Sequence, residues 1–166
     1  MEILDFNKVN NVLDIEEQIN EFIKRGIITK YQSQVINPHK IVKFFKSDIG
    51  KRMLKSNFIK REQAIYSQIK IKDIYTNENF EVDNIKDYDN ESIMLRGIID
   101  AYFEEDDNII LIDYKTDFVN DENKEDVIKR YKKQINLYSE VLEELTGKKV
   151  KEKWIYLFGI DEGILM

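Results

Sequence analysis

The sequence predicts an α/β (α+β) domain in which a mixed central β-sheet is flanked by helices. Three observations support this prediction. The first third of the chain shows helix-type spacing of apolar residues, the middle contains apolar segments with partial alternation, and a long amphipathic segment precedes one last apolar segment. With 166 residues, the chain is expected to be a single domain over 1–166, with a helical part at 1–56 and a core at 57–166.

Helices are expected throughout the N-terminal part. Asp14 is a suitable N-cap for a helix with apolar residues at spacings of three and four, and Gly26 should end it. Asn37, followed directly by proline, predicts the start of another helix. Ser47 should cap a further short helix that Gly50 interrupts.

The middle of the chain predicts strands. Residues 57–71 contain apolar side chains with partial alternation, whereas residues 76–92 are polar and acidic and should form a loop. Strands are expected at 92–103 and 108–115. The short acidic segment between these two strands predicts a turn, and therefore a β-hairpin.

The C-terminal third predicts one long helix followed by one strand. Residues 122–146 carry an apolar stripe at helical spacing, and Gly147 should end the helix. Residues 150–158 are too apolar to be an exposed segment, and we expect a last, buried strand there.

Composition excludes several classes of protein and site. There is no cysteine, which excludes disulfide scaffolds, thiol nucleophiles and cysteine-bound metal or iron–sulfur clusters. His39 is the single histidine, and we expect it to be an exposed residue in the first turn of a helix. The net charge of −6 argues against a non-specific nucleic-acid binder, although it permits a local site. No segment resembles a membrane span or signal peptide, so the expected compartment is the cytoplasm.

Asp100, Asp113 and Lys115 carry the chemistry that the sequence suggests. Each aspartate follows an apolar strand segment, where a charge is costly unless something pairs with it. Two carboxylates on adjacent strands can converge on one cation, and oxygen ligands suit Mg²⁺ or Mn²⁺. Lys115 is two residues after Asp113, so both side chains should point to one face of the sheet. The alternative from spacing alone is a surface hairpin with salt-bridged charges.

Several ordered motifs make a resemblance to a known family specific. They are Arg61-Glu62-Gln63, Gly97-Ile98-Ile99-Asp100 with Phe103-Glu104-Glu105, Asp113-Tyr114-Lys115-Thr116-Asp117, Arg130-Tyr131 with Gln134 and Tyr138, and the strand from Trp154 to Phe158. The pattern resembles the PD-(D/E)XK nuclease superfamily with its restriction-endonuclease-like fold. More narrowly, it is similar to the RecB-like nuclease domains at the C-terminus of AddA, the helicase–nuclease component of bacterial AddAB complexes. The resemblance covers residues 36–158.

The resemblance implies a role for each matching residue. Asp100 and Asp113 would be metal ligands, and the backbone carbonyl of Tyr114 would complete the site. Lys115 would be the catalytic lysine. The implied cofactor is Mg²⁺, or Mn²⁺, acting in phosphodiester hydrolysis.

Further residues of the matching motifs would surround this site. Gln134 and Tyr138 lie one helical turn apart and would position the substrate or the lysine. Glu62 would be a carboxylate facing the metal, or else a salt-bridge partner of Arg61 or Lys60.

The start of the predicted long helix carries a basic cluster. Lys129, Arg130 and Lys133 lie near Gln134 and are candidate DNA contacts, with a solvated helix face as the alternative. Tyr131, on nearly the same face as Gln134, is expected to be a core aromatic residue.

The resemblance implies a metal-dependent DNA nuclease, acting as an exonuclease within an ATP-dependent helicase–nuclease that processes double-strand breaks for recombinational repair. Its partners would be DNA, the helicase portion of the same polypeptide and an AddB-like partner protein. The alternatives are a restriction-type endonuclease of the same superfamily, or a catalytically incomplete module that keeps the nuclease fold for DNA binding or subunit packing.

One departure from the family pattern bears on these alternatives. RecB-like nucleases commonly carry a metal-binding histidine in a Gly-Thr-x-x-His motif on a preceding helix, and this sequence has no such motif. We therefore expect the chain to be a fragment that begins just after that helix, or a reduced homologue, with residues 57–166 as its catalytic core.

Overall fold

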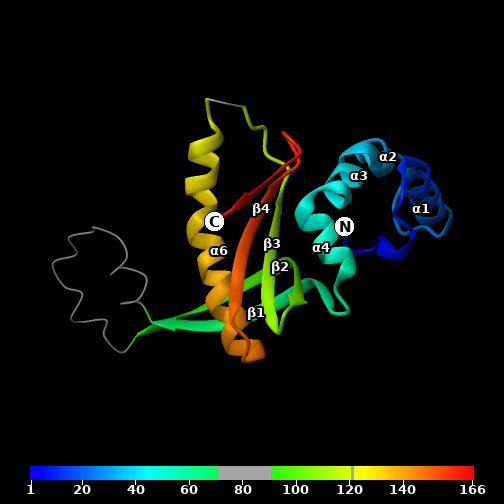
Figure 1. Cartoon of the computed structure of the whole chain (residues 1–166). Coiled ribbons are helices and arrows are strands. Elements are labelled where there is room, and N and C mark those ends of the chain that lie inside the picture. Colours follow the sequence, from blue (N-terminus) through cyan, green and yellow to red (C-terminus); the bar gives the residue numbers. More distant parts are fainter. Residues whose placement is uncertain (71–90, 121) are drawn as a thin grey trace.

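The computed structural model describes residues 1–70, 91–120 and 122–166. Helix α6 (Lys124–Thr146) covers one face of a five-stranded sheet, and the N-terminal helices lie on the other side (Figure 1). These helices are the 3-10 turn η1 (Phe6–Lys8), α1 (Val12–Lys24), α2 (Lys30–Ser33), α3 (Pro38–Lys46) and α4 (Asp48–Lys55). Of the helices in the described ranges, none is long and apolar enough to cross a membrane.

The sheet is mixed, as predicted. Its strands, in spatial as well as sequence order, are β1 (Ile59–Lys70), β2 (Ser92–Glu105), β3 (Asn108–Lys115), β4 (Val150–Leu157) and β5 (Glu162–Leu165). β3 and β4 pair in parallel, and the other neighbours pair antiparallel. The parallel pair requires a long crossover between its strands, and α6 provides it.

The helix-start signals were mostly correct, with one error. The N-cap of α1 is Asn11, whose side chain accepts hydrogen bonds from first-turn N–H groups, and Asp14 is the third helical residue that completes the capping box. Gly26 follows the end of this helix with a φ of +69°, which favours glycine. Asn37 and Ser47 cap α3 and α4 as predicted.

Gly50 does not interrupt α4; it allows α3 and α4 to meet closely. A Cβ atom at this position would lie 2.0 Å from the carbonyl oxygen of Phe44. The residue is therefore glycine because the backbone of α3 occupies the space that a side chain would need.

Two hydrophobic cores lie on opposite faces of the sheet. The core on the N-terminal side contains Ile15, Phe44, Ile49, Met53, Phe103, Ile110, Ile112 and Tyr156 among its buried residues. The core beneath α6 contains Ile65, Ile99, Ile109, Leu111, Ile135, Leu142, Ile155 and Leu157 among its buried residues. β3 contributes to both cores in alternation, so it is the central strand with both faces covered.

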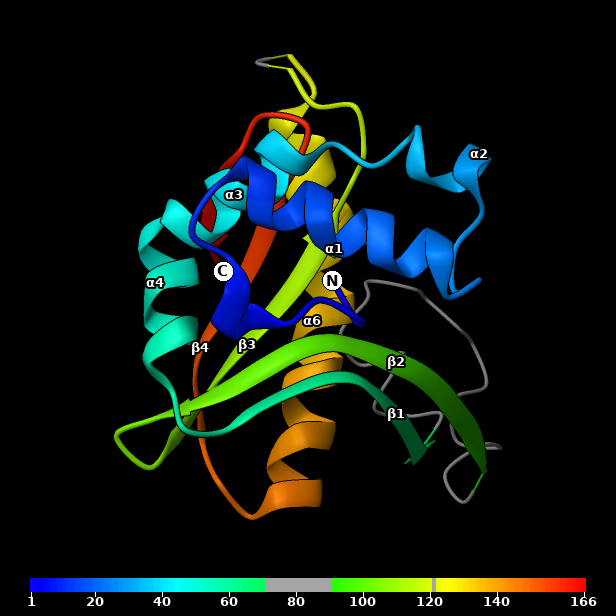
Figure 2. The ribbon, with the colours of Figure 1, turned by 90° about the vertical axis from the view of Figure 1, so that its right-hand side faces the viewer.

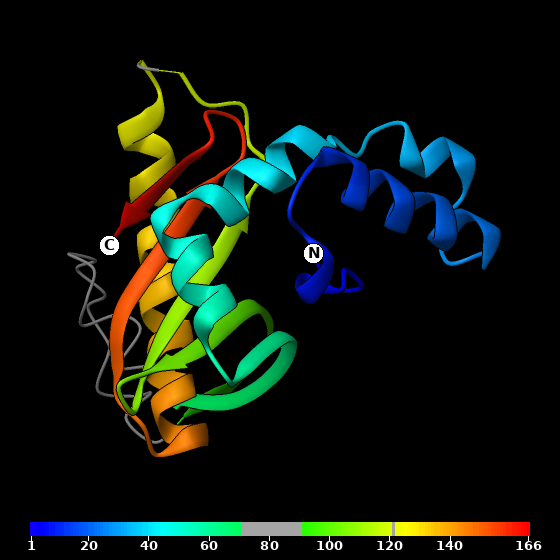
Figure 3. The ribbon, with the colours of Figure 1, turned by 45° about the vertical axis from the view of Figure 1, so that its right-hand side comes forward.

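The β1–β2 hairpin bends sharply beside the centre of the sheet (Figures 2 and 3). The ladder of paired residues is interrupted at Glu62 and Asp100, which lie between the pairs Arg61–Ala101 and Gln63–Ile99. Glu62 has a φ of +49°, an unusual conformation for a non-glycine residue within a strand. The side chain of Ile99 belongs to the core beneath α6, whereas that of Ala101 belongs to the opposite core.

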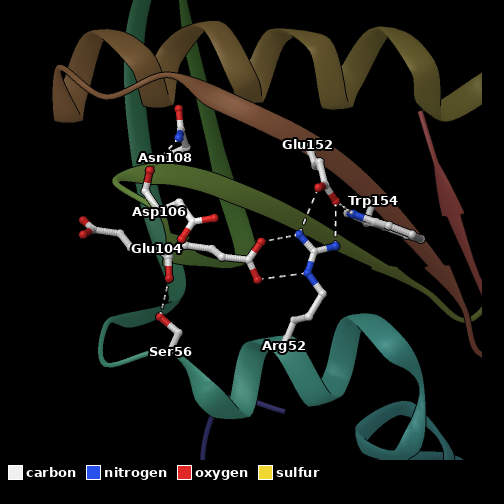
Figure 4. A network of polar contacts seen from close by, with 8 residues as sticks. Arg52, Ser56, Glu104, Asp106, Asn108, Glu152 and Trp154 are labelled. Carbon is white, nitrogen blue, oxygen red and sulfur yellow. Dashed lines mark hydrogen bonds and ion pairs between the residues drawn. The ribbon is translucent and has the colours of Figure 1, made fainter.

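Arg52 joins α4 to the sheet through a charged network (Figure 4). Its guanidinium donates hydrogen bonds to both carboxylate oxygens of Glu105 at 3.0 and 2.6 Å and to those of Glu152 at 2.8 and 2.9 Å. The Trp154 indole N–H donates to Glu152 at 2.7 Å. This network ties the β2–β3 turn and β4 to the helical side, and it lowers the pKa of both glutamates.

Two further segments concern the sequence predictions. The predicted loop at 76–92 lies, apart from its last two residues, outside the described residues. β5 was not predicted, because a four-residue edge strand after a turn carries little periodic signal. The division into parts at 1–56 and 57–166 stays a prediction, and β1 begins close to it.

Candidate active site

Three carboxylates lie in one row across three neighbouring strands. The β1–β2 register places Glu62 opposite Asp100. The β2–β3 register runs from Glu105–Asn108 to Ala101–Ile112, and its continuation by one residue places Asp100 opposite Asp113. Asp100 is therefore not at a strand end, as the sequence suggested, but within β2 at the bend of the hairpin.

Asp113 and Lys115 project from the α6 side of β3, as alternation along the strand predicts. Asp113 is 2% exposed, and its Oδ2 is a fully buried oxygen. The Lys115 ammonium lies beside it, with Nζ 2.7 Å from Oδ2 in an ion pair. A buried carboxylate is costly for the fold, which favours a role in binding or catalysis.

Asp100 faces Asp113 and is anchored by the backbone of β3. Its Oδ2 accepts a hydrogen bond of 2.7 Å from the backbone N–H of Tyr114. Burial, and secondarily the neighbouring Asp100, raises the pKa of Asp113 against the opposing effect of Lys115. Two carboxylates that share one site in this way are stabilised by an added cation.

Gln134 and Tyr138 reach the same site from α6. The side chain of Gln134 accepts a hydrogen bond of 2.9 Å from Lys115 Nζ and donates one of 3.3 Å to the Tyr138 hydroxyl. Tyr138 packs against Gly97, where a Cβ atom would lie 3.0 Å from the tyrosine ring and hydroxyl. The structure thus brings together the predicted lysine, glutamine and tyrosine.

Glu62 lies at the outer end of the row of carboxylates. Its side chain is exposed, and partial burial followed by the charge of Asp100 raises its pKa. No ion pair to Arg61 is found for it; Arg61 instead donates hydrogen bonds to the carbonyls of Met1 and Leu4. Arg61 is thus engaged elsewhere, and the alternative of a salt bridge between Glu62 and Lys60 stays a prediction.

The donor set at this site fits a hard divalent cation. Among the residues that the structure describes, no group of three or more Asp, Glu or His side chains is arranged to hold a metal ion. Asp100 and Asp113 still supply two facing carboxylates, and the buried Oδ2 of Asp113 is paired with the Lys115 ammonium. Magnesium is commonly held by one or two carboxylates together with water and substrate phosphate, so two protein carboxylates are sufficient.

Comparison with known proteins gives the family. The sequence model that describes the PD-(D/E)XK nuclease superfamily matches residues 12–164 of this chain. The chain belongs to the PD-(D/E)XK nuclease superfamily. Its fold, a mixed sheet between helices, is the one that the sequence resemblance predicted.

Relatives of this nuclease domain include proteins named as subunits of an ATP-dependent helicase/nuclease. The chain is 58% identical over 165 residues to the one from Clostridioides difficile (strain 630), with coverage of 99% of this chain. It is 46% identical over 158 residues, 95% of this chain, to the one from Thermoanaerobacter sp. (strain X514). The chain spans only 12–13% of the length of these relatives. The matches favour the nuclease hypothesis over a non-catalytic module.

The basic residues predicted to bind DNA lie on the exposed side of α6 in the nuclease domain. Lys129, Arg130 and Lys133 are all exposed. Arg130 contacts Asp117, in the segment that follows β3, at 3.4 Å. Helical geometry places Lys129 about 140° around α6 from Gln134, so it faces away from the carboxylates. The role of these residues in DNA binding stays a prediction.

The single histidine lies outside the nuclease site. His39 is exposed in the first turn of α3, where its backbone N–H donates a hydrogen bond to the side-chain oxygen of Asn37. This is the position that the sequence predicted.

Two residues beside the lysine were not assigned a role from the sequence. Tyr131 was predicted to be a core aromatic residue, and it does pack at the edge of the core beneath α6. It also covers the Lys115 ammonium and donates a hydrogen bond to Asp117. The signal available in the sequence was the helical spacing of Tyr131, Gln134 and Tyr138 together with Asp117 two residues after the lysine.

Proposed function

We propose that this nuclease domain hydrolyses phosphodiester bonds in DNA with the help of Mg²⁺ or Mn²⁺. The observation that carries the proposal is the placement of the Lys115 ammonium beside the facing carboxylates of Asp100 and Asp113. A site made only of carboxylates would repel a phosphate group. A site that combines a bound cation with an ammonium attracts the phosphate instead.

Asp100, Asp113 and the backbone carbonyl of Tyr114 would hold the cation, with Glu62 as a further carboxylate at the outer end of the row. The bound metal would supply Lewis acidity and positive charge beside the phosphate. The Lys115 ammonium would stabilise negative charge that develops on the phosphate oxygens. Gln134 and Tyr138 would fix the direction of the Lys115 side chain through their chain of hydrogen bonds.

We further propose that the domain works as an exonuclease in a larger cytoplasmic helicase–nuclease that processes double-strand breaks. Support comes from similarity over 99% of this chain to a relative named as part of an ATP-dependent helicase/nuclease. The helicase portion of such a polypeptide and an AddB-like protein would be its partners. The DNA backbone would be contacted by Arg130, which lies beside Asp117, and by the neighbouring Lys129 and Lys133.

The decisive experiment measures degradation of end-labelled linear DNA, single- and double-stranded, with Mg²⁺, Mn²⁺ or EDTA. Lys115→Met and Asp113→Asn change the charge with little change in shape, and each should lower the rate at least about 100-fold. Lys149→Ala, an exposed lysine in the turn before β4, is the matched control and should leave the rate unchanged.

Binding of the metal can be measured separately from cleavage. Calorimetric titration of Mn²⁺ into the DNA-free chain should give a signal for the wild type that is weakened in Asp100→Asn and Asp113→Asn. Metal-dependent cleavage that persists in Lys115→Met and Asp113→Asn would refute the proposed site. Equal Mn²⁺ binding by wild type and both aspartate variants would refute the proposed ligands.

A further inference from the structure

The ring of Tyr131 covers the ammonium of Lys115. Lys115 Nζ lies 4.1 Å from the centroid of the Tyr131 ring, within the range of a cation–π interaction. The same ammonium lies 2.7 Å from Asp113 Oδ2 and 2.9 Å from Gln134 Oε1. Three side chains therefore surround this cation, and only Tyr131 has no role in the proposed function.

Asp117 fixes the hydroxyl end of Tyr131. The Tyr131 hydroxyl lies 3.0 Å from Oδ1 and 2.9 Å from Oδ2 of Asp117 and donates to this carboxylate. Arg130 contacts the same carboxylate at 3.4 Å. The Asp117 carboxylate, which binds the Tyr131 hydroxyl, is therefore also bound by Arg130 on α6.

The backbone that carries Asp117 is also fixed. The Phe158 N–H donates a hydrogen bond of 2.8 Å to the carbonyl of Lys115, which joins the end of β3 to the end of β4. The carbonyl of Asp117 lies against Gly159, where a Cβ atom would approach it to 2.6 Å. Asp117 and Lys115 therefore sit on one anchored segment, and Tyr131 faces both of them from α6.

A lysine side chain has four flexible methylene groups, and one ion pair and one hydrogen bond leave it freedom to swing. A fixed aromatic ring over the ammonium removes much of this freedom and holds the ammonium at one place. We propose that Tyr131 is a positioning residue that holds the Lys115 ammonium at the site, and that Asp117 acts through Tyr131 by fixing its hydroxyl. This inference rests on the proposed catalytic role of Lys115.

The first test follows the Lys115 side chain directly, in the chain labelled with ¹³C-lysine. Ring currents should shift the ε-methylene protons of Lys115 upfield, and the peak is assigned by its loss in Lys115→Arg. The shift and the low mobility of this methylene should be reduced in Tyr131→Phe, which keeps the ring but loses the hydroxyl that Asp117 fixes. Both should be lost in Tyr131→Leu, which keeps an apolar side chain of similar size but no ring. This measurement needs neither metal nor DNA.

The second test uses cleavage kinetics. Tyr131→Leu should lower kcat by about 2- to 30-fold, the factor that corresponds to one cation–π interaction, with KM nearly unchanged. Tyr131→Phe and Asp117→Ala should each give a smaller loss. The double variant should lose no more than the larger single loss, because Asp117 is proposed to act through the Tyr131 hydroxyl.

The outcomes separate this inference from the proposed function. If Lys115→Met abolishes cleavage while Tyr131→Leu keeps the wild-type kcat and an immobile Lys115, Tyr131 is only a packing residue and the inference is wrong. Additive losses in Asp117→Ala and Tyr131→Phe would refute the role of Asp117. If Lys115→Met cleaves like the wild type, the proposed function fails instead. Should Tyr131→Leu not fold, as thermal unfolding would reveal, the wild type alone still tests the inference: an ε-methylene signal of Lys115 that is mobile and lacks the upfield ring-current shift would refute it.

Discussion

Without a divalent metal, Asp113 should make the folded domain less stable as the pH rises. Burial, with the charge of Asp100 adding to it, raises the pKa of Asp113 from 3.8 to about 6 despite the neighbouring Lys115. The folded state therefore binds the proton more tightly than the unfolded state does. The stabilisation that the protonated Asp113 contributes is complete below about pH 4. It is lost as the pH rises through the folded-state pKa of Asp113.

The expected magnitude follows from the shift in the pKa. A change of about two units corresponds to about 3 kcal/mol in the free energy of unfolding. Asp113 is only 2% exposed, so solvent does not screen this effect appreciably. In Asp113→Asn the group cannot titrate. The difference in unfolding free energy between Asp113→Asn and wild type should therefore shift by about 3 kcal/mol in favour of the variant between pH 4 and pH 8.

Urea denaturation in EDTA, at steps of half a pH unit, measures this difference. The change with pH isolates the titration, because any cost of the substitution that does not depend on pH cancels. Asp126→Asn, at an exposed position in the first turn of α6, is the matched control. Parallel stability curves for wild type and Asp113→Asn across this range would refute the argument. Saturating Mn²⁺ should stabilise the wild type at pH 8 and the variant much less.

Three further predictions concern the scaffold and the DNA contact. Gly50→Ala should lower the melting temperature by about 10 °C, because its Cβ would meet the backbone of α3; an unchanged melting curve would contradict the close approach. Arg52→Met should cost about 1–2 kcal/mol at pH 7 in urea denaturation, and less below pH 4, as the pH falls through the lowered pKa values of Glu105 and Glu152. In fluorescence anisotropy titrations, Arg130→Gln should weaken DNA binding more than Lys129→Gln does. It should also reduce the slope of the logarithm of the binding constant against the logarithm of the salt concentration by about one. Equal effects of the two variants would contradict the proposed closeness of Arg130 to the bound DNA.

Local signals in the sequence were sufficient for most of the helices and strands. Asn37 followed by proline, and Ser47, mark helix starts because their side chains satisfy the first N–H groups of the helix. Asn11 was missed because Asp14, three residues later, is an equally good cap, and the two in fact form one capping box. Periodicity could not reveal the bend at Glu62, since a left-handed conformation within a strand is imposed by neighbouring strands.

The candidate site was only partly predictable. Alternation along β3 correctly placed Asp113 and Lys115 on one face, and helical spacing correctly placed Gln134 and Tyr138 together. The roles of these residues stay proposals. The contact between Tyr131 and Lys115 could not be derived, because it joins α6 to β3 through the packing of the core.

The sequence by itself determined the order of most helices and strands and the family to which the chain belongs. These properties depend on local spacing and residue type. Only the tertiary structure decided that Glu62, Asp100 and Asp113 form one row and that Tyr131 covers the lysine. Such arrangements depend on strand register and on where α6 lies across the sheet. Register and helix placement are set by contacts between distant parts of the chain, which no local pattern contains.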